Sequence, residues 1–402
     1  MGPGTPAWIE AQREQLLARG GLARAEVRVA LAPYRICPLG AHLDHQHGPV
    51  LGTAIDAFTA LAFAPAPGPE LVLESGNYPG EVRLDLAAPA GAEPPELPAW
   101  GRYAQGAVRA LRERLGPRPV GLVGRVEGSL PGAGLSSSSS VLLAYLTALA
   151  ARNGLALRPE ELVALSRRAE NEHVGVQSGI LDPASIVASR RGALVRIDTA
   201  AARWERVPVG PAAPPHAFLV AFTGQARSLV GTDFNRRVEE CRAAAAALAL
   251  RAGLPATRFL GDLDDAVFAD HGAALPPTLQ RRARHFASER RRVLRGVECW
   301  RRGDLEAFGA LMRESCQSSL ENYETGSPEL ASLQRILEAT PGVFGARFSG
   351  AGFGGCCVAL VAEAEAEAAR ARVLAAFAAE HPGLEGRACA FVAHGEDGVR
   401  IA

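Results

Sequence analysis

The ten residues Pro131-Gly-Ala-Gly-Leu-Ser-Ser-Ser-Ser-Ser140 are the most informative stretch of this 402-residue chain. They follow a strand-like run, Gly121 to Val126, and precede an apolar segment, Val141 to Arg152, whose periodicity predicts a helix. Glycine lets a backbone turn tightly and approach a ligand closely, and the amides at a helix N-terminus attract anions. A flexible Gly/Ser linker has a similar composition, but such linkers seldom lead directly into an amphipathic helix. The stretch therefore predicts a loop that binds phosphate.

The charged residues are balanced, with 43 basic and 43 acidic side chains, and every basic residue is arginine. A balanced chain gives no reason to expect nucleic acid or a membrane surface as a partner. The absence of lysine excludes a Walker A site, a protein-kinase site and Schiff-base chemistry, because each of these requires a lysine. A nucleotide at the serine-rich loop must therefore be held by backbone amides, the helix dipole, magnesium and arginine.

The cysteines and the first residues bear on the cellular compartment. Seven cysteines, at positions 37, 241, 299, 316, 356, 357 and 389, show no C-x-x-C spacing, which argues against zinc and predicts reduced, mostly buried thiols. Residues 1–20 lack the apolar stretch of a signal peptide, and no apolar run is long enough to span a bilayer. We expect a cytoplasmic protein.

Short β-type runs and helical segments occur in both halves of the chain, which predicts an α+β fold. A proline-rich break at Pro208 to Pro215 predicts a boundary between an N-terminal domain, 1–208, and a C-terminal domain, 209–402. In the second half, Gly350-Ala-Gly-Phe-Gly-Gly355 matches G-x-G-x-x-G, but the following Cys356 to Val361 has the pattern of a strand. A dinucleotide site needs a helix there, so we predict a glycine turn between two strands that another backbone or a ligand approaches closely.

The serine-rich loop and the glycine turn, taken with four further segments, resemble the GHMP small-molecule kinases, and within them the galactokinases. The first segment, Ala32-Pro-Tyr-Arg-Ile-Cys-Pro-Leu-Gly-Ala-His-Leu-Asp-His-Gln-His-Gly48, is similar to the sugar-binding signature of that branch. The others are Ala169-Glu-Asn-Glu-His-Val-Gly-Val-Gln-Ser-Gly-Ile-Leu-Asp182, Asp233-Phe-Asn-Arg-Arg237, and Leu311-Met-Arg-Glu-Ser315 with Tyr323-Glu324. The resemblance implies a two-domain α+β kinase whose active site lies in the cleft between the domains.

The resemblance also implies how ATP and magnesium bind. The residues around the ATP phosphates would be Gly132, Ala133, Gly134, Leu135, Ser136, Ser137 and Ser138. The Ser138 hydroxyl and the Glu170 carboxylate would hold Mg²⁺, a hard cation that keeps its remaining positions for phosphate and water. Taken alone, Ser138 fits a helix N-cap and Glu170 fits a solvated helix face.

The catalytic pair implied by the resemblance is Asp182 as the base and Arg35 as its neighbouring arginine. Phosphoryl transfer needs a carboxylate that accepts the proton of the sugar hydroxyl and a cation that stabilises the developing charge. Taken alone, Asp182 before Pro183 fits a turn residue. Pro183 stands where the family normally has glutamine.

The sugar-binding residues implied by the resemblance depart from the galactokinase pattern at several positions. The implied set is Ala41, His42, Asp44, Gly179, Asp182 and Phe234. Ala41 replaces a glutamate of the family, His45 an aromatic residue, Tyr34 a glycine and Phe234 a tyrosine, whereas His42 and Asp44 are retained.

The replacement at position 41 points to the acceptor, because in galactokinases that glutamate lies against the C6 hydroxyl. A glutamate about 4 Å from a C6 carboxylate would repel it by roughly 4 kcal/mol at an effective dielectric near 20. Losing one hydrogen bond to a neutral C6 hydroxyl costs only about 1 kcal/mol. The segment from Pro33 to His45 also resembles that of plant galacturonokinases, which favours phosphorylation of D-galacturonate at C1.

Some alternatives stay open at this stage. The chain would otherwise be a galactokinase or glucuronokinase with altered sugar contacts, or a catalytically silent galactokinase-like sensor. Asp44 would bind ring hydroxyls, and His42, His45 or an arginine not identified by the sequence would pair with the substrate carboxylate.

Overall fold

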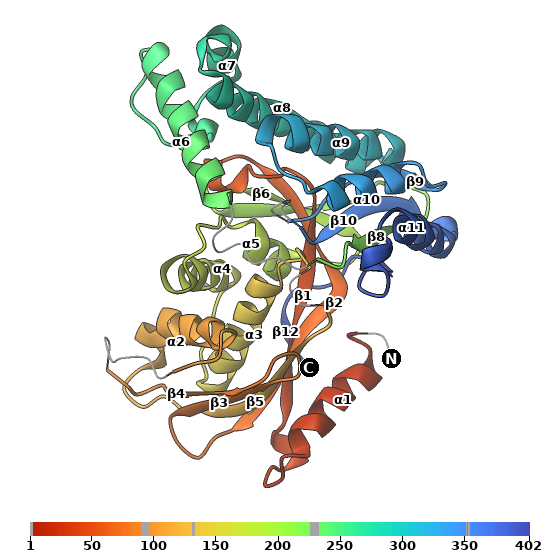
Figure 1. The fold of residues 1–402 in the computed structure, drawn as a ribbon. Coiled ribbons are helices and arrows are strands. Elements are labelled where there is room, and N and C mark those ends of the chain that lie inside the picture. The colour runs from red at the N-terminus through yellow and green to blue at the C-terminus, as the bar shows by residue number, and fades with distance from the viewer. Residues whose placement is uncertain (1–2, 90–95, 131–132, 226–232, 351, 353) are drawn as a thin grey trace.

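Two β-sheets organise the chain in the computed structural model, which describes residues 3–89, 96–130, 133–225, 233–350, 352 and 354–402 (Figure 1). In this part of the chain the larger sheet has eight strands, in the order β12-β1-β2-β5-β3-β4, with β6 paired to β2 and β7 to β6. The smaller sheet has four antiparallel strands in the order β11-β8-β10-β9. The strands of the larger sheet are β1 (Arg28–Leu39), β2 (Val50–Pro65), β3 (Glu70–Ser75), β4 (Glu81–Asp85), β5 (Leu122–Gly128), β6 (Ala193–Asp198), β7 (Arg203–Pro208) and β12 (Arg400–Ile401). Those of the smaller sheet are β8 (His216–Phe222), β9 (Val343–Phe348), β10 (Cys356–Ala362) and β11 (Cys389–Ala393).

Helices cover both sheets, so the predicted α+β class is confirmed. Among them α2 (Gly101–Leu115) and α3 (Ser137–Arg152) pack on the larger sheet, and α4 (Pro159–Arg168) packs on α2 and α3. Helices α10 (Pro328–Glu338) and α11 (Ala366–Glu380) do the same on the smaller sheet. The remaining helices are α1 (Pro6–Leu17), α5 (Leu181–Ala188), α6 (Phe234–Arg251), α7 (Asp265–His271), α8 (Pro277–Arg302) and α9 (Leu305–Ser318).

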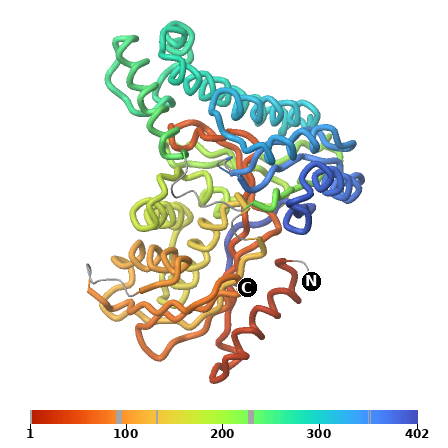
Figure 2. Tube along the Cα trace, viewed as in Figure 1, coloured from red at the N-terminus to blue at the C-terminus, as the bar shows by residue number. Residues whose placement is uncertain are grey.

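The chain passes from one sheet to the other between β7 and β8, which is where the sequence predicts a boundary between domains 1–208 and 209–402. The final strand then returns to the larger sheet. Ala30 of β1 lies opposite Ile401 of β12, and Figure 2 shows the blue C-terminal end running beside the red strand. The boundary between residues 208 and 209 stays a prediction, and the last residues of the chain pair with a strand of the first predicted domain.

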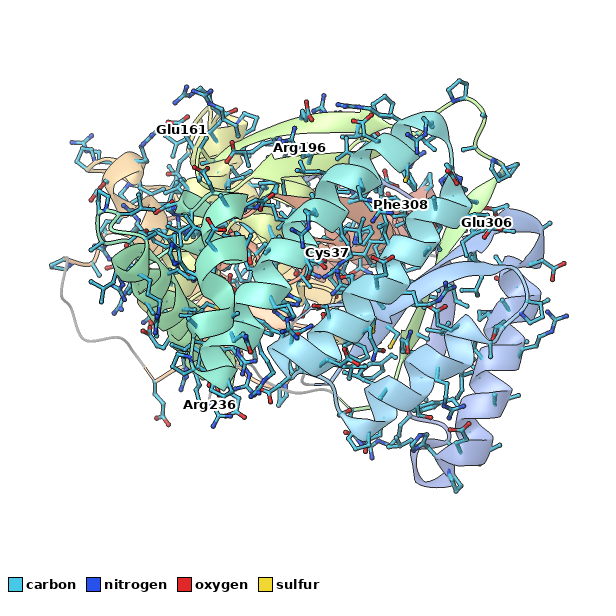
Figure 3. The ribbon with its side chains drawn as sticks, turned by 90° about the horizontal axis from the view of Figure 1, so that it is seen from above. Cys37, Glu161, Arg196, Arg236, Glu306 and Phe308 are labelled. Carbon is cyan, nitrogen blue, oxygen red and sulfur yellow. The ribbon has the colours of Figure 1, made fainter. Side chains whose placement is uncertain are left out.

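One apolar core joins the upper part of β1 to both sheets and to the long helices. It includes Cys37 of β1, Val220 of β8, Val293 of α8 and Phe308 of α9. Seen from above, Cys37 lies beneath the layer formed by α8 and α9 (Figure 3). Nearly every residue of β1 is buried, so its few polar side chains must form hydrogen bonds or ion pairs within the protein. The cysteines are free thiols, all buried except the half-buried Cys389, as predicted.

The glycine turn between β9 and β10 packs against the backbone of the serine-rich loop. The two strands are antiparallel, with Cys357 opposite Phe348, so the exclusion of a dinucleotide-binding motif is confirmed. A Cβ on Gly355 (φ +97°) would lie 2.7 Å from the Ala133 carbonyl oxygen, and one on Gly350 (φ +76°) 2.8 Å from that of Gly134. Only glycine permits this approach, which brings the second half of the chain against the loop.

Candidate active site

The serine-rich loop leads into the first turn of α3, one turn before the predicted helix start at Val141. Ser136 caps the helix in a left-handed conformation (φ 59°), and the first helical hydrogen bond runs from the Ser140 amide to the Ser136 carbonyl at 2.9 Å. Ser137 and Ser138 therefore lie in the first turn, where backbone amides precede the helical ladder and the dipole is positive. Ala133, Gly134 and Leu135 form the approach to the cap, and Gly132 lies outside the described residues. This is the local geometry of an anion site.

Asp182 and Arg35 meet directly beside this loop. Arg35 Nε donates to Asp182 Oδ1 at 2.7 Å, and Arg35 Nη1 donates to the Gly134 carbonyl at 3.3 Å. The Ser136 hydroxyl donates to the other oxygen, Asp182 Oδ2. Burial lowers the pKa of Arg35, but the Asp182 carboxylate more than offsets it and the pKa is raised. The guanidinium therefore stays charged and joins the carboxylate to the loop.

The local backbone structure orients the side chains of Arg35 and Asp182 toward each other. Arg35 follows an irregularity in the β1–β2 pairing between Pro33 and Tyr34, which re-aims the side chains beyond it. Asp182 lies in the first turn of α5, and Pro183 is the next residue of that turn. A proline is tolerated there because the amide it lacks would have no helical acceptor. The departure at Pro183 is thus compatible with a helical Asp182.

Glu170 and Ser138 also come together. Glu170 lies in a π-helical turn, Ala169–Val174, and its carboxylate accepts hydrogen bonds from the hydroxyls of Ser138 and, at 2.7 Å, Ser178. Burial and then the nearby Asp182 charge raise the pKa of Glu170 to about 7. An ionised Glu170 carboxylate is destabilised by burial and by the neighbouring negative charge, so a bound cation would stabilise it.

Asp44 lies close enough to Asp182 and Arg35 to interact with both charges. Burial, followed by the charge of Asp182, raises its pKa to about 6. A Cβ on Gly179 would lie 2.2 Å from Asp44 Oδ2, so only glycine leaves room for this carboxylate. The structure therefore brings Asp44, Gly179 and Asp182 together, as the predicted site requires.

The other predicted sugar residues gather around Tyr323. The His42 ring stacks on the Tyr323 ring with centroids 3.9 Å apart, and His45 Nε2 lies 3.0 Å from the Tyr323 hydroxyl. Phe234 meets the His45 ring edge-on at 6.0 Å. Burial lowers the pKa of both histidines, that of His45 to about 3, so the two rings are neutral. Neither ring therefore supplies a positive charge, and both nitrogens of His45 already have protein partners, Tyr323 and Gln46.

Sequence reasoning missed several residues that build this site. Tyr323 belonged to a recognised segment but received no role, and the contact of Ser136 with Asp182 was not foreseen. Ser178 also belonged to a recognised segment without a role, and His285 and Glu289 carried no sequence signal at all. Each makes its contacts across turns or across the two halves of the chain.

Comparisons with known proteins agree with this geometry. The model described as "GHMP kinases N terminal domain" matches residues 102–190, and "GHMP kinases C terminal" matches residues 297–379. A galacturonokinase from Arabidopsis thaliana is 41% identical over 388 residues, covering 92% of this chain and 91% of that protein. The chain belongs to the GHMP kinase family. A galactokinase from Roseiflexus sp. (strain RS-1) is 34% identical, with 92% of each chain covered.

A solved structure extends the likeness of this GHMP kinase to the three-dimensional fold. Lactococcus lactis galactokinase, crystallised with galactose, superposes with a TM-score of 0.86 at 29% identity, covering 98% of this chain and 99% of that one. The chain is therefore a two-domain GHMP sugar kinase, a phosphotransferase with an alcohol acceptor and ATP as co-substrate. In the part of the chain that the structure describes, no helix is long and apolar enough to cross a membrane.

The kinase offers few protein ligands to a metal. Within the described ranges no three His, Cys, Asp or Glu side chains group as a metal site would. The predicted magnesium set does not need such a group, because one carboxylate and one hydroxyl suffice when phosphates and water complete the shell. Ser138 donates a hydrogen bond to Glu170, and burial together with the neighbouring Asp182 carboxylate raises the pKa of Glu170, so a cation between these groups would be favoured and the residues fit Mg²⁺.

Replacing Glu170 by glutamine is expected to weaken magnesium-dependent activity and to stabilise the metal-free fold at alkaline pH. The carboxyl titrates near 4.5 when unfolded and about 7 when folded, so its cost to folding grows as pH rises between these values. The cost above about pH 7 is on the order of 3 kcal/mol. Melting curves at about pH 5 and about pH 8 should show a gain several times larger at the higher pH. An unchanged magnesium dependence of the rate would contradict the assignment.

Proposed function

We propose that this kinase transfers the γ-phosphoryl group of ATP to the C1 hydroxyl of D-galacturonate, giving α-D-galacturonate 1-phosphate and ADP. Asp182 accepts the proton of the anomeric hydroxyl as the bond from that oxygen to the γ-phosphorus forms. The bond to the bridging oxygen of ADP breaks, and ADP leaves. Arg35 orients the Asp182 carboxylate through a hydrogen bond and lies close enough to the loop to stabilise charge on the transferring group.

The donor is held at the start of α3. We assign its phosphates to the amides from Gly132 to Ser138, which suits a chain without lysine. Mg²⁺ held by Ser138 and Glu170 would supply charge compensation to the phosphates and fix their orientation. A bound Mg²⁺ would also balance the charge of the site. Arg35 is surrounded by three carboxylates, those of Asp44, Glu170 and Asp182.

The observation that carries the choice of acceptor is Ala41. Its methyl group is buried in the turn before His42, where a galactokinase glutamate would place a negative charge. Removing that charge improves the binding free energy of an acid substrate by more than the loss of one hydrogen bond weakens the binding of a neutral sugar. The greater identity to a protein named galacturonokinase than to proteins named galactokinase supports the same choice. Asp44, His42 and Phe234 are assigned to the sugar ring.

Competing acceptors provide the direct test. Purified protein with Mg-ATP should be assayed with galacturonate, glucuronate, galactose and arabinose, and the specificity constants kcat/KM compared. We expect galacturonate to have the largest value and the product to carry its phosphate at C1. A larger value for galactose would refute the uronic-acid assignment and leave the kinase chemistry intact.

A further inference from the structure

We propose that Glu289 and His285 of α8 are positioning residues for the acceptor sugar, acting through the backbone of the Gly40–Ala41–His42 turn. The two side chains are one helical turn apart and therefore share a face of α8. The proposal rests on the proposed function in one respect, which is that Ala41 and His42 face the acceptor. On this proposal, a helix of the C-terminal half of the chain holds in place a sugar-binding turn that belongs to the N-terminal half.

Hydrogen bonds from α8 hold both polar backbone groups of Ala41. Glu289 Oε1 accepts the amides of Gly40 at 2.7 Å and Ala41 at 3.2 Å. The Ala41 carbonyl lies 3.0 Å from His285 Nε2. A carbonyl only accepts, so Nε2 carries the proton, and His285 Nδ1 is left to accept from the Ser318 hydroxyl at 3.0 Å. The turn is thus held at its donor and its acceptor by two residues of one helix.

Charge compensation keeps Glu289 able to accept several hydrogen bonds. The side chain is fully buried, with Arg292 Nε 2.6 Å from Oε2 and Arg347 Nη1 3.8 Å from Oε1. The Ser315 hydroxyl donates to Oε1 at 2.6 Å. Burial alone would raise the pKa of Glu289, but the two guanidiniums more than offset this and lower it to about 2. The carboxylate is therefore ionised throughout the working pH range.

The turn needs this support because its backbone conformation is unfavourable. His42 has φ 61°, a left-handed conformation that a residue with a Cβ adopts only when its surroundings require it. Stacking on Tyr323 holds its ring, and the bonds to Glu289 and His285 hold the preceding peptide groups. If these bonds are lost, the turn can relax and move both Ala41 and His42 relative to the acceptor.

Glu289→Gln tests the first half of the proposal, with Glu396→Gln as its matched control. Glu396 is also a buried carboxylate in ion pairs, with Arg191 and Arg400. In Glu289→Gln we expect the acceptor KM to rise on the order of tenfold or more, because small misplacements of a binding group are costly. The kcat and the ATP KM should stay close to wild type. Glu396→Gln should lower the melting temperature without changing the acceptor KM.

A pair of His285 variants keeps the test valid if Glu289→Gln folds poorly. The amide of His285→Gln can still donate to the Ala41 carbonyl, whereas His285→Leu cannot. The glutamine variant should therefore retain the acceptor KM and the leucine variant should raise it, with similar melting temperatures. The proposal is overturned if both variants keep the wild-type acceptor KM, or if kcat falls and both KM values rise together as the melting temperature drops. All constants are measured with whichever acceptor the wild type prefers, so a failed galacturonate assignment is recognised separately.

Discussion

Replacing Asp182 by asparagine is expected to lower kcat by about 10²- to 10⁴-fold, the range for loss of a general base. Both carboxylate oxygens are engaged, Oδ1 by Arg35 and Oδ2 by the Ser136 hydroxyl. Ser136 belongs to the serine-rich loop, and Arg35 contacts it at the Gly134 carbonyl. An asparagine keeps the shape and one acceptor oxygen but cannot take a proton from the sugar. The loss should therefore fall on the chemical step.

Single-turnover rates and ATP binding separate chemistry from folding in this variant. We expect the single-turnover rate to fall with kcat while the Kd for Mg-ATP changes by only a few-fold, because Asp182 is not among the phosphate-binding groups. Asp198→Asn is a suitable control, since that carboxylate only accepts the Ala201 amide at 3.1 Å on the surface. A variant that retains a tenth or more of the wild-type rate would show that Asp182 is not the base.

The parts of the site that are contiguous in sequence were predictable. The serine-rich loop lies between a strand and a helix because glycine and serine favour a turn and a helix start, and both features are local. The glycine turn was predictable for the same reason, since the residues after Gly355 form a short, continuous apolar run with two valines, as a fully buried strand does. The start of α3 was placed a turn late because the prediction relied on apolar periodicity, which the serines of the first turn do not share.

The acceptor side of the site was much less predictable, because its contacts are long-range. Glu289 contacts Ala41 across 248 residues and His45 reaches Tyr323 across 278. No local pattern marks a buried glutamate on an arginine-rich helix as a ligand of a distant backbone amide. The short final strand β12 was missed for a related reason, because two residues carry no periodicity and pair only once β1 is in place.

Ala41→Glu is expected to lower kcat/KM for galacturonate about a thousandfold, through roughly 4 kcal/mol of charge repulsion, while galactose loses less than about tenfold. The substitution can also act on the turn itself. Ala41 is buried and its amide is bound by Glu289, so a new carboxylate also meets an existing one. Part of any loss could therefore come from displacement of the turn rather than from repulsion of the substrate.

Ala41→Gln separates these two effects, because glutamine has nearly the size of glutamate and no charge. Displacement of the turn would reduce galacturonate and galactose turnover alike in both variants. Repulsion of a C6 carboxylate would reduce galacturonate turnover only in Ala41→Glu, and raising the salt concentration would do little to restore it in a buried site. The ratio of kcat/KM for the two sugars, compared between the glutamate and glutamine variants, therefore measures the charge effect alone. An equal ratio in both variants would show that residue 41 does not face the C6 group, and the choice of a uronic acid would lose its main support.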